Sequence, residues 1–318
     1  MKGSYLVTVK NRRLQYKFTI NRNITILHGD SATGKTTLID MIHTYQENGE
    51  ASGVSVTCEC NCAVLTSSNW QINLASLNNT IVFIDEGNSF ILSKDFAQSV
   101  KNSTNYYVIA TRNPLFTLPY SITEIYGIKN DSANKYQGTK RLYSSFYPLY
   151  SSNVTIKPDL IIVEDSNSGF AFFENAAKHF SIPCISAKGK AKIHAVAAVS
   201  SYDNILIIAD GAAFGSEIER IMSLRHVKNI GIYMPESFEW LILKSDVLND
   251  SSVDSILANP SDFIESQKYL SWEQFFTSLL IEKSQGTYLE YKKSKLNPAY
   301  LQNNEMTKII SEMPEILN

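Results

Sequence analysis

The stretch at residues 29–36 constrains the fold of this chain most, and it reads Gly-Asp-Ser-Ala-Thr-Gly-Lys-Thr. A short β-branched and apolar run at 23–28 precedes it, which is typical of a buried strand. Leu38, Ile39 and Ile42 follow at helical spacing. A strand, a glycine-rich loop and a helix in this order predict an α/β fold built on a parallel sheet.

The same stretch matches the phosphate-loop pattern G-x-x-x-x-G-K-[ST]. Glycines let the backbone bend so that its N–H groups point at phosphate oxygens, on the N-terminus of the following helix. The lysine would reach the β- and γ-phosphates, and the final threonine would bind Mg²⁺. We therefore expect ATP and Mg²⁺ as cofactors. The predicted nucleotide-binding residues are Gly29, Asp30, Ser31, Ala32, Thr33, Gly34, Lys35, Thr36 and Thr37.

Two further strands end in polar residues. The run 80–84 ends in Asp85 and Glu86. Such a strand is expected beside the loop, with Asp85 holding Mg²⁺ together with Thr36 and Glu86 polarising the attacking water as a catalytic residue. The run 106–110 ends in Thr111 and Arg112, which are candidate sensors of the γ-phosphate. The alternative for these two is an ordinary turn before Pro114.

The composition limits which classes of protein this chain can belong to. The chain has 318 residues, 44% hydrophobic and 19% charged, which suits a folded globular protein of two domains. Its formal net charge is −2, so any nucleic-acid surface must be local. No apolar run approaches the roughly 20 residues that span a bilayer, and the N-terminus lacks the apolar core of a signal peptide. We expect a cytoplasmic protein without a membrane partner.

Three of the four cysteines, Cys58, Cys60 and Cys62, occupy alternate positions. On a strand they would share one face. Three thiols can bind metal, but no fourth ligand lies nearby in the sequence and the spacing is not that of a zinc pair. We expect a buried face with a structural role.

The polar region 130–157 predicts a domain boundary near residue 150. We expect a phosphate-loop domain at 1–150, a second α/β domain at 151–260 and a helical C-terminal segment at 261–318. The first domain should open with a β-hairpin over 5–20. The C-terminal segment carries an apolar stripe that favours packing or dimerisation, and its members are Trp272, Phe275, Phe276, Leu279 and Leu280.

The hairpin before the loop resembles the start of ABC- and SMC-type ATPases. Only about fifty residues separate the two nucleotide motifs, and no Leu-Ser-Gly-Gly signature occurs between them. The ATP sandwich of that group is therefore not expected. The first domain instead reads as a compact α/β NTPase.

Strand and helix patterns alternate in the second domain, which predicts another mostly parallel sheet. Glu164, Lys188, Lys190 and Asp210 fall at carboxyl ends of its strands, where sites collect in such sheets.

The second domain resembles the Toprim domain of topoisomerases, primases and OLD-family nucleases. The resemblance covers about 157–245 and implies Glu164 as catalytic general acid/base and Asp210 as a catalytic metal ligand. Asp-x-Asp is usual at the latter strand end, but here the second acid is Ala212. Glu164 is followed by Asp165 where glycine is usual. The nearby acids Glu217, Glu236 and Glu239 could complete the metal site, and we select Glu217 and Glu239.

The order of an ATPase domain and a Toprim-like domain resembles OLD-type proteins, several of which act in bacterial and phage conflict. This implies an ATPase that controls cleavage or binding of nucleic acid, with DNA favoured over RNA, in a homo-oligomer or with a partner protein. One alternative is a nucleotide-switched assembly module whose second domain is not catalytic, as Ala212 favours. Two others stay open: a second domain that is an unrelated Rossmann-like fold, and a small-molecule kinase.

Overall fold

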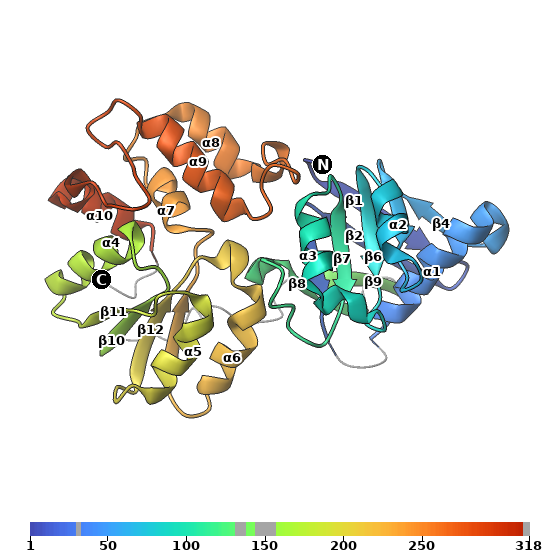
Figure 1. Cartoon of the computed structure of the whole chain (residues 1–318), viewed down its shortest axis with the longest axis horizontal. Helices are drawn as coiled ribbons and strands as arrows, with labels where there is room; N and C mark the ends of the chain where they lie inside the picture. Colours follow the sequence, from blue (N-terminus) through green and yellow to red (C-terminus); the bar gives the residue numbers. More distant parts are fainter. Residues whose placement is uncertain (30–32, 131–137, 144–156, 314–318) are drawn as a thin grey trace. The chain divides into compact units, whose positions relative to one another are not determined.

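The computed structural model describes residues 1–29, 33–130, 138–143 and 157–313. The chain divides into two compact units (Figure 1). The first consists of residues 1–146 and 259–271, and the second of residues 147–258 and 272–318. The segment 261–318, which we expected to be separate, is thus divided between the units.

The first unit is built on a nine-stranded sheet whose order is β4-β1-β2-β9-β8-β3-β7-β6-β5. Strands β1 (Tyr5–Lys10) and β2 (Leu14–Ile20) form the predicted antiparallel hairpin. Strand β4 (Ser55–Thr57) pairs antiparallel with β1. On the other side, β9 (Gly138–Tyr143) runs parallel to β2 and antiparallel to β8 (Ile125–Asn130).

The remaining strands of this sheet run parallel to one another, and β3, β6 and β7 are buried along their whole length. Strand β3 (Ile24–Leu27) lies between β8 and β7 (Tyr106–Ala110), and then come β6 (Thr80–Ile84) and β5 (Asn61–Val64). The three strands predicted to form the nucleotide site all form. However, β7 separates β3 from β6, so the strand that ends at Asp85 does not pair directly with the strand that leads into the loop.

Helix α1 (Lys35–Asn48) packs against strands from both halves of the sheet, namely β1 and β4 on one side and β5 on the other. Its buried Leu38, Ile39 and Ile42 join side chains of β1, β2, β6 and β7 in one core. The helical spacing of these three residues in the sequence therefore places them together on the buried face of α1. The shorter helices are α2 (Trp70–Ser76) and α3 (Lys94–Lys101), with 3₁₀ turns η1 (Gly49–Ser52), η2 (Ser89–Leu92) and η3 (Ile122–Glu124).

Residues 259–271, which include the 3₁₀ turn η6 (Pro260–Asp262), are bound to the first unit by hydrogen bonds from its N-terminal part. The backbone N–H of Gly3 donates to the Ser261 carbonyl at 2.7 Å. The buried side chain of Asn23 donates through Nδ2 to the carbonyls of Ser266 and Tyr269, at 3.1 and 2.9 Å. A segment remote in sequence thus satisfies buried polar groups of the sheet.

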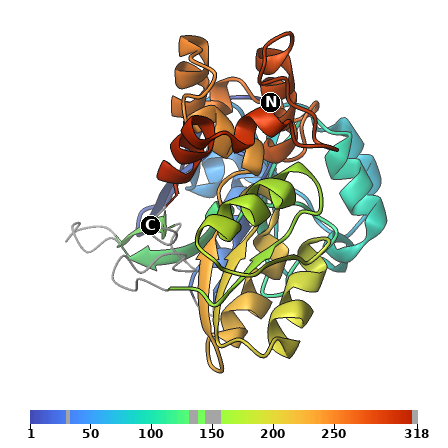
Figure 2. The same cartoon turned by 90° about the vertical axis from the view of Figure 1, so that its left-hand side faces the viewer.

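The second unit contains a four-stranded sheet of order β11-β10-β12-β13, and every pairing in it is parallel, as predicted. Helices α5 and α6 lie side by side along it (Figures 1 and 2). The strands are β10 (Leu160–Val163), β11 (Cys184–Ser186), β12 (Asn204–Ile208) and β13 (Asn229–Tyr233). The intervening helices are α4 (Ser168–His179), α5 (Lys190–Val199) and α6 (Ile218–Leu224), with 3₁₀ turns η4 (Gly211–Ala213) and η5 (Gly215–Glu217).

The C-terminal helices complete this unit, and α7 packs against α9 (Figure 1). The predicted apolar stripe lies on α9 and is buried within the chain, so its role is packing. The helices are α7 (Phe238–Lys244), α8 (Ser251–Ala258), α9 (Trp272–Ser284) and α10 (Asn303–Ser311), with the 3₁₀ turn η7 (Pro298–Leu301). Within the described ranges, every helix is too short or too polar to cross a lipid bilayer.

Candidate functional site

The glycine-rich loop has the backbone conformation that its glycines predict. Gly29 and Gly34 have φ values of 128° and 104°, a region that residues with a side chain rarely adopt. Helix α1 begins directly after Gly34, so its first N–H groups face the loop. Asp30, Ser31 and Ala32 lie outside the described residues. Thr37 lies in the first turn of α1.

Lys35 binds back to the loop, and Thr36 connects the start of α1 with Asp85. The Lys35 ammonium donates to the Gly29 carbonyl at 2.5 Å and to Thr33 Oγ1 at 3.4 Å. Thr36 Oγ1 donates to Asp85 Oδ1 at 3.4 Å, although these residues are 49 positions apart in sequence. A hydroxyl and a carboxylate placed together beside a lysine form an oxygen-rich set of the kind that Mg²⁺ takes in phosphate-loop sites.

Glu86 and Arg112 also meet, which the sequence did not predict. Their side chains form an ion pair at 3.0 Å. Both line an open pocket of about 350 Å³ at the ends of β6 and β7. Thr111 is engaged otherwise: its Oγ1 donates to the Asn113 carbonyl and accepts from the Asn113 N–H, at 2.9 and 3.1 Å. Its hydroxyl therefore closes a strand-end turn, the alternative that the sequence left open.

Two residues that sequence reasoning missed contact the loop from the strand pair β2–β9. Tyr16 Oη donates to the Gly34 carbonyl at 2.8 Å, and Lys140 Nζ donates to the Thr33 carbonyl at 3.0 Å. A Cβ on Gly34 would meet Lys140 Nζ at 2.5 Å and Tyr16 Oη at 2.7 Å. A side chain at position 34 would displace these two side-chain ends, and the φ of 104° independently favours glycine there. Lys140 lies 107 residues from Thr33, and no local motif marks it.

A second polar cluster lies in the second unit, at the carboxyl ends of β10 and β12. The backbone N–H of Asp210 donates to Glu164 Oε2 at 3.2 Å, and the Phe238 N–H donates to Asp210 Oδ1 at 3.1 Å. Lys190 donates to the Ala213 carbonyl at 2.6 Å and lies close enough to Glu164 for their charges to interact. The structure therefore brings Glu164 and Asp210 together, as the sequence led us to expect.

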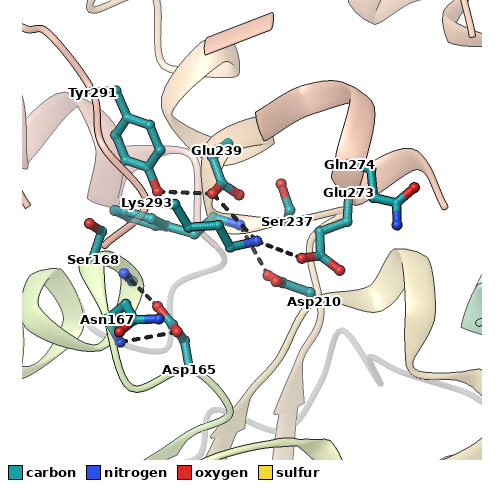
Figure 3. A network of polar contacts seen from close by, with 12 residues as sticks. Asp165, Asn167, Ser168, Asp210, Ser237, Glu239, Glu273, Gln274, Tyr291 and Lys293 are labelled. Atoms are coloured by element: carbon teal, nitrogen blue, oxygen red, sulfur yellow. Dashed lines mark hydrogen bonds and ion pairs between the residues drawn. The ribbon is translucent and has the colours of Figure 1, made fainter. Parts of the chain in front are cut away.

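Helices α7 and α9 and the segment after α9 add four side chains to this cluster (Figure 3). The Lys293 ammonium lies 2.6 Å from Glu273 Oε1 and 3.9 Å from Glu239 Oε1. Tyr291 Oη donates to Glu239 Oε1 at 2.9 Å. Glu239 was a predicted ligand; Glu273, Tyr291 and Lys293 were missed because they follow the predicted α/β domain in sequence. We call Glu164, Asp210, Glu239, Glu273, Tyr291 and Lys293 the carboxylate cluster.

Burial and crowding shift the titration of this cluster. Burial raises the pKa of Glu164 to about 7. Burial, together with the charges of Glu273 and Glu239, holds the pKa of Asp210 well above its usual value. Burial alone would lower the pKa of Lys293, but Glu239 and Glu273 outweigh it and the net shift is upward. The surroundings thus favour bound protons on Glu164 and Asp210 and a charged Lys293.

Two further acids, the predicted ligand Glu217 and the neighbouring Asp165, have different partners. Glu217 is buried and pairs with Arg220 at 3.5 Å, and its charge acts on Lys190 rather than on Asp210. Asp165 accepts hydrogen bonds from the backbone N–H groups of Asn167 and Gly169, at 3.0 and 2.9 Å, and so stabilises the start of α4 (Figure 3). Its position after Glu164 therefore has a structural reason.

The carboxylate cluster borders a small cavity of about 20 Å³, the size of a single water. Carboxylate oxygens are the donors that Mg²⁺ prefers, but in the part of the chain that the structure describes no three His, Cys, Asp or Glu side chains are arranged to hold a metal ion. The metal ligands expected here, Glu164, Asp210, Glu217 and Glu239, stay a prediction.

A scan against protein-family models finds no match to this chain, and searches of curated proteins and of solved structures find no similar protein. The function is therefore inferred from the residues of the two sites themselves.

Proposed function

We propose that this protein binds ATP with Mg²⁺ and hydrolyses it at the glycine-rich loop of the first unit. The observation that carries the proposal is the contact between Thr36 Oγ1 and Asp85 Oδ1 at the start of α1, beside Lys35. A threonine hydroxyl and a carboxylate from distant segments meet where a bound triphosphate would need its metal.

The residues present fit that cofactor. Thr36 and Asp85 would hold Mg²⁺, which neutralises phosphate charge when bound. Lys35 would exchange its bond to the Gly29 carbonyl for phosphate oxygens. Glu86 would orient the attacking water once Arg112 releases it from their ion pair, and Arg112 could then face the γ-phosphate.

The direct test is Lys35→Ala, with Lys94→Ala on the exposed side of α3 as the matched control. Loss of a charged contact to phosphate should weaken ATP binding roughly tenfold to a hundredfold. Isothermal titration with ATP and Mg²⁺ measures it. Equal affinity for ATP in wild type and Lys35→Ala would remove the basis of the proposal.

We further propose that the second unit acts on nucleic acid, preferably DNA, under the control of ATP. The support is the pair Glu164–Asp210 at the carboxyl ends of parallel strands, where sites collect in such sheets. Asp210→Asn and Glu164→Gln should abolish Mn²⁺-dependent nicking of plasmid DNA, while Glu174→Gln on the exposed side of α4 should not. Nicking that survives both variants would contradict a role for the cluster.

The second candidate is a nucleotide-switched assembly module. Two observations favour it: Ala212 stands where a second acid would complete a metal site, and the Lys293 ammonium already lies among the carboxylates. Wild-type protein that binds DNA or a partner in an ATP-dependent way, without cleavage in Mn²⁺ or Mg²⁺, would identify this candidate.

A further inference from the structure

The cysteines Cys58, Cys60 and Cys62 lie at an unusual place in the sheet of the first unit. Strands β4 and β5 occupy the two ends of the nine-strand order, yet they are joined by the short connection 58–60. The three side chains alternate with the exposed Glu59 and Asn61, and all three are half-buried against the core. They were expected to form a buried face; they are half-buried and within reach of small reagents.

The thiols contact one another. Cys58 Sγ lies 3.5 Å from Cys60 Sγ, within hydrogen-bonding distance, and Cys62 also interacts with Cys58. A sulfur that accepts hydrogen bonds from two neighbouring thiols loses its own proton more readily, so the pKa of Cys58 is lowered. The same bonds, together with burial, raise the pKa values of Cys60 and Cys62. The other ionisable groups that face this cluster are Glu59, Tyr5 and Tyr106.

We propose that Cys58 and Cys60 form a redox pair, which hydroperoxides convert to a disulfide with Cys58 reacting first and Cys60 as the resolving thiol. The geometry carries the pairing: the two sulfurs are already in contact, on a connection that is partly open to solvent. The lowered pKa of Cys58 favours it as the first thiol to react. This inference does not depend on the proposed function.

The reaction balances with one hydroperoxide. The Cys58 thiolate attacks the terminal oxygen, the O–O bond breaks, and a sulfenic acid forms. The alkoxide takes a proton from solvent, which had received the Cys58 proton, and leaves as an alcohol, or as water from hydrogen peroxide. Cys60 sulfur then attacks the Cys58 sulfur. The S–S bond forms, and the departing hydroxide takes the Cys60 proton and leaves as water.

A disulfide between Cys58 and Cys60 would restrict the backbone of the connection between β4 and β5. Strand β5 is held to α1 by a hydrogen bond from the Val64 N–H to Gln46 Oε1, at 2.7 Å. Helix α1 in turn begins at Lys35. The cysteine pair is therefore linked through β5 to α1, the helix that follows the glycine-rich loop.

Peptide mapping of the whole protein tests the disulfide. Native protein is treated with hydrogen peroxide, its remaining thiols are blocked with N-ethylmaleimide, and it is cleaved after glutamates. Cleavage at Glu59 and Glu86 separates peptide 51–59, which holds Cys58, from peptide 60–86, which holds Cys60 and Cys62. We expect the two peptides joined, and separated again by dithiothreitol. Separate peptides after oxidation would overturn the proposal.

Variants assign the partner and supply the control. Cys60→Ser should abolish the link, whereas Cys62→Ser and Cys184→Ser should retain it; a link that survives Cys60→Ser would refute the assignment. Cys184 is also half-buried, and burial raises its pKa to about 12, so it is the matched thiol. At pH 7, limiting iodoacetamide should label Cys58 at least about tenfold faster than Cys184. Equal rates would contradict a thiolate at Cys58.

Discussion

The pKa of Glu164 is set by the groups around its carboxyl. Its carboxyl lies beside the Asp210 backbone and near Glu273 and Asp165, and burial raises its pKa to about 7. The folded chain therefore holds this proton more tightly than the unfolded chain, for which the usual value is 4.5. Between these two pH values the folded state binds more protons, so the contribution of Glu164 to stability falls as pH rises.

Glu164→Gln should flatten this dependence. Relative to the variant, the wild type should lose on the order of 2–3 kcal/mol of unfolding free energy between pH 5 and pH 7.5. Urea unfolding in the presence of EDTA, in a Trp70→Phe background, follows the second unit through Trp240 and Trp272. Glu174→Gln is the control, and a difference between wild type and Glu164→Gln that stays constant with pH would refute the prediction.

Lys293 supplies a second prediction at this scale. Its ammonium lies against Glu273 and near Glu239, so Lys293→Met removes the cation and leaves buried acids without it. The cluster should then bind Mn²⁺ more tightly than in the wild type, because metal and ammonium compete for the same oxygens. Electron paramagnetic resonance titration of Mn²⁺ measures this, with Lys292→Met, at an exposed lysine, as control. An unchanged or weaker Mn²⁺ affinity would argue against competition.

At the scale of elements, the glycine-rich loop depends on a strand pair that its motif does not mention. The hydrogen bonds from Tyr16 and Lys140 reach it from β2 and β9. Gly34 combines a positive φ with this close approach, whereas Gly53 has a φ of 70° and no atom within 4 Å of an added Cβ. A comparison of Gly34 with Gly53 therefore distinguishes the effect of backbone strain from that of steric contact.

Gly34→Ala should weaken ATP binding at least about tenfold and destabilise the first unit by about 1–3 kcal/mol. Gly53→Ala shares the backbone strain without the contact, so it should cost roughly 1 kcal/mol and keep the affinity for ATP. Calorimetric titration and urea unfolding check the pair. Similar ATP affinities for the two variants would show that the contact with Tyr16 and Lys140 is unimportant.

The elements themselves were largely predictable, because periodicity and strand-end residues are local signals. The strand before Gly29, the helix after Thr36 and the four parallel strands of the second unit all form as expected. The insertion of β7 between β3 and β6 was not predictable, since strand order follows from packing across the whole sheet. Lys140, Glu273 and Lys293 were missed for the same reason: each reaches its site from an element distant in sequence.

At the scale of the whole molecule, the chain moves between units three times. Residues 259–271 return to the first unit, where Asn23 binds two of their carbonyls, and the chain then enters α9, which carries Glu273 of the carboxylate cluster. The segment that completes the first unit is therefore joined by one peptide bond to a helix of the second.

Asn23→Ala should loosen this segment. It removes two buried hydrogen bonds, a cost of about 1–3 kcal/mol to local stability. The exposed Lys268 then becomes accessible to trypsin more often, so cleavage there should be several-fold faster than in wild type. The control is Asn48→Ala, which removes an exposed hydrogen bond from the side-chain amide to the Thr44 carbonyl. Equal cleavage rates in Asn23→Ala and wild type would contradict the assigned role.

This path of the chain also has a genetic consequence. A stop codon between α7 and α8 would remove residues 259–271 from the first unit and α9 from the second in a single event. A frameshift there would deprive Asn23 of its partners as surely as it would deprive Lys293 of Glu273. A single truncation at that point would therefore damage both units at once.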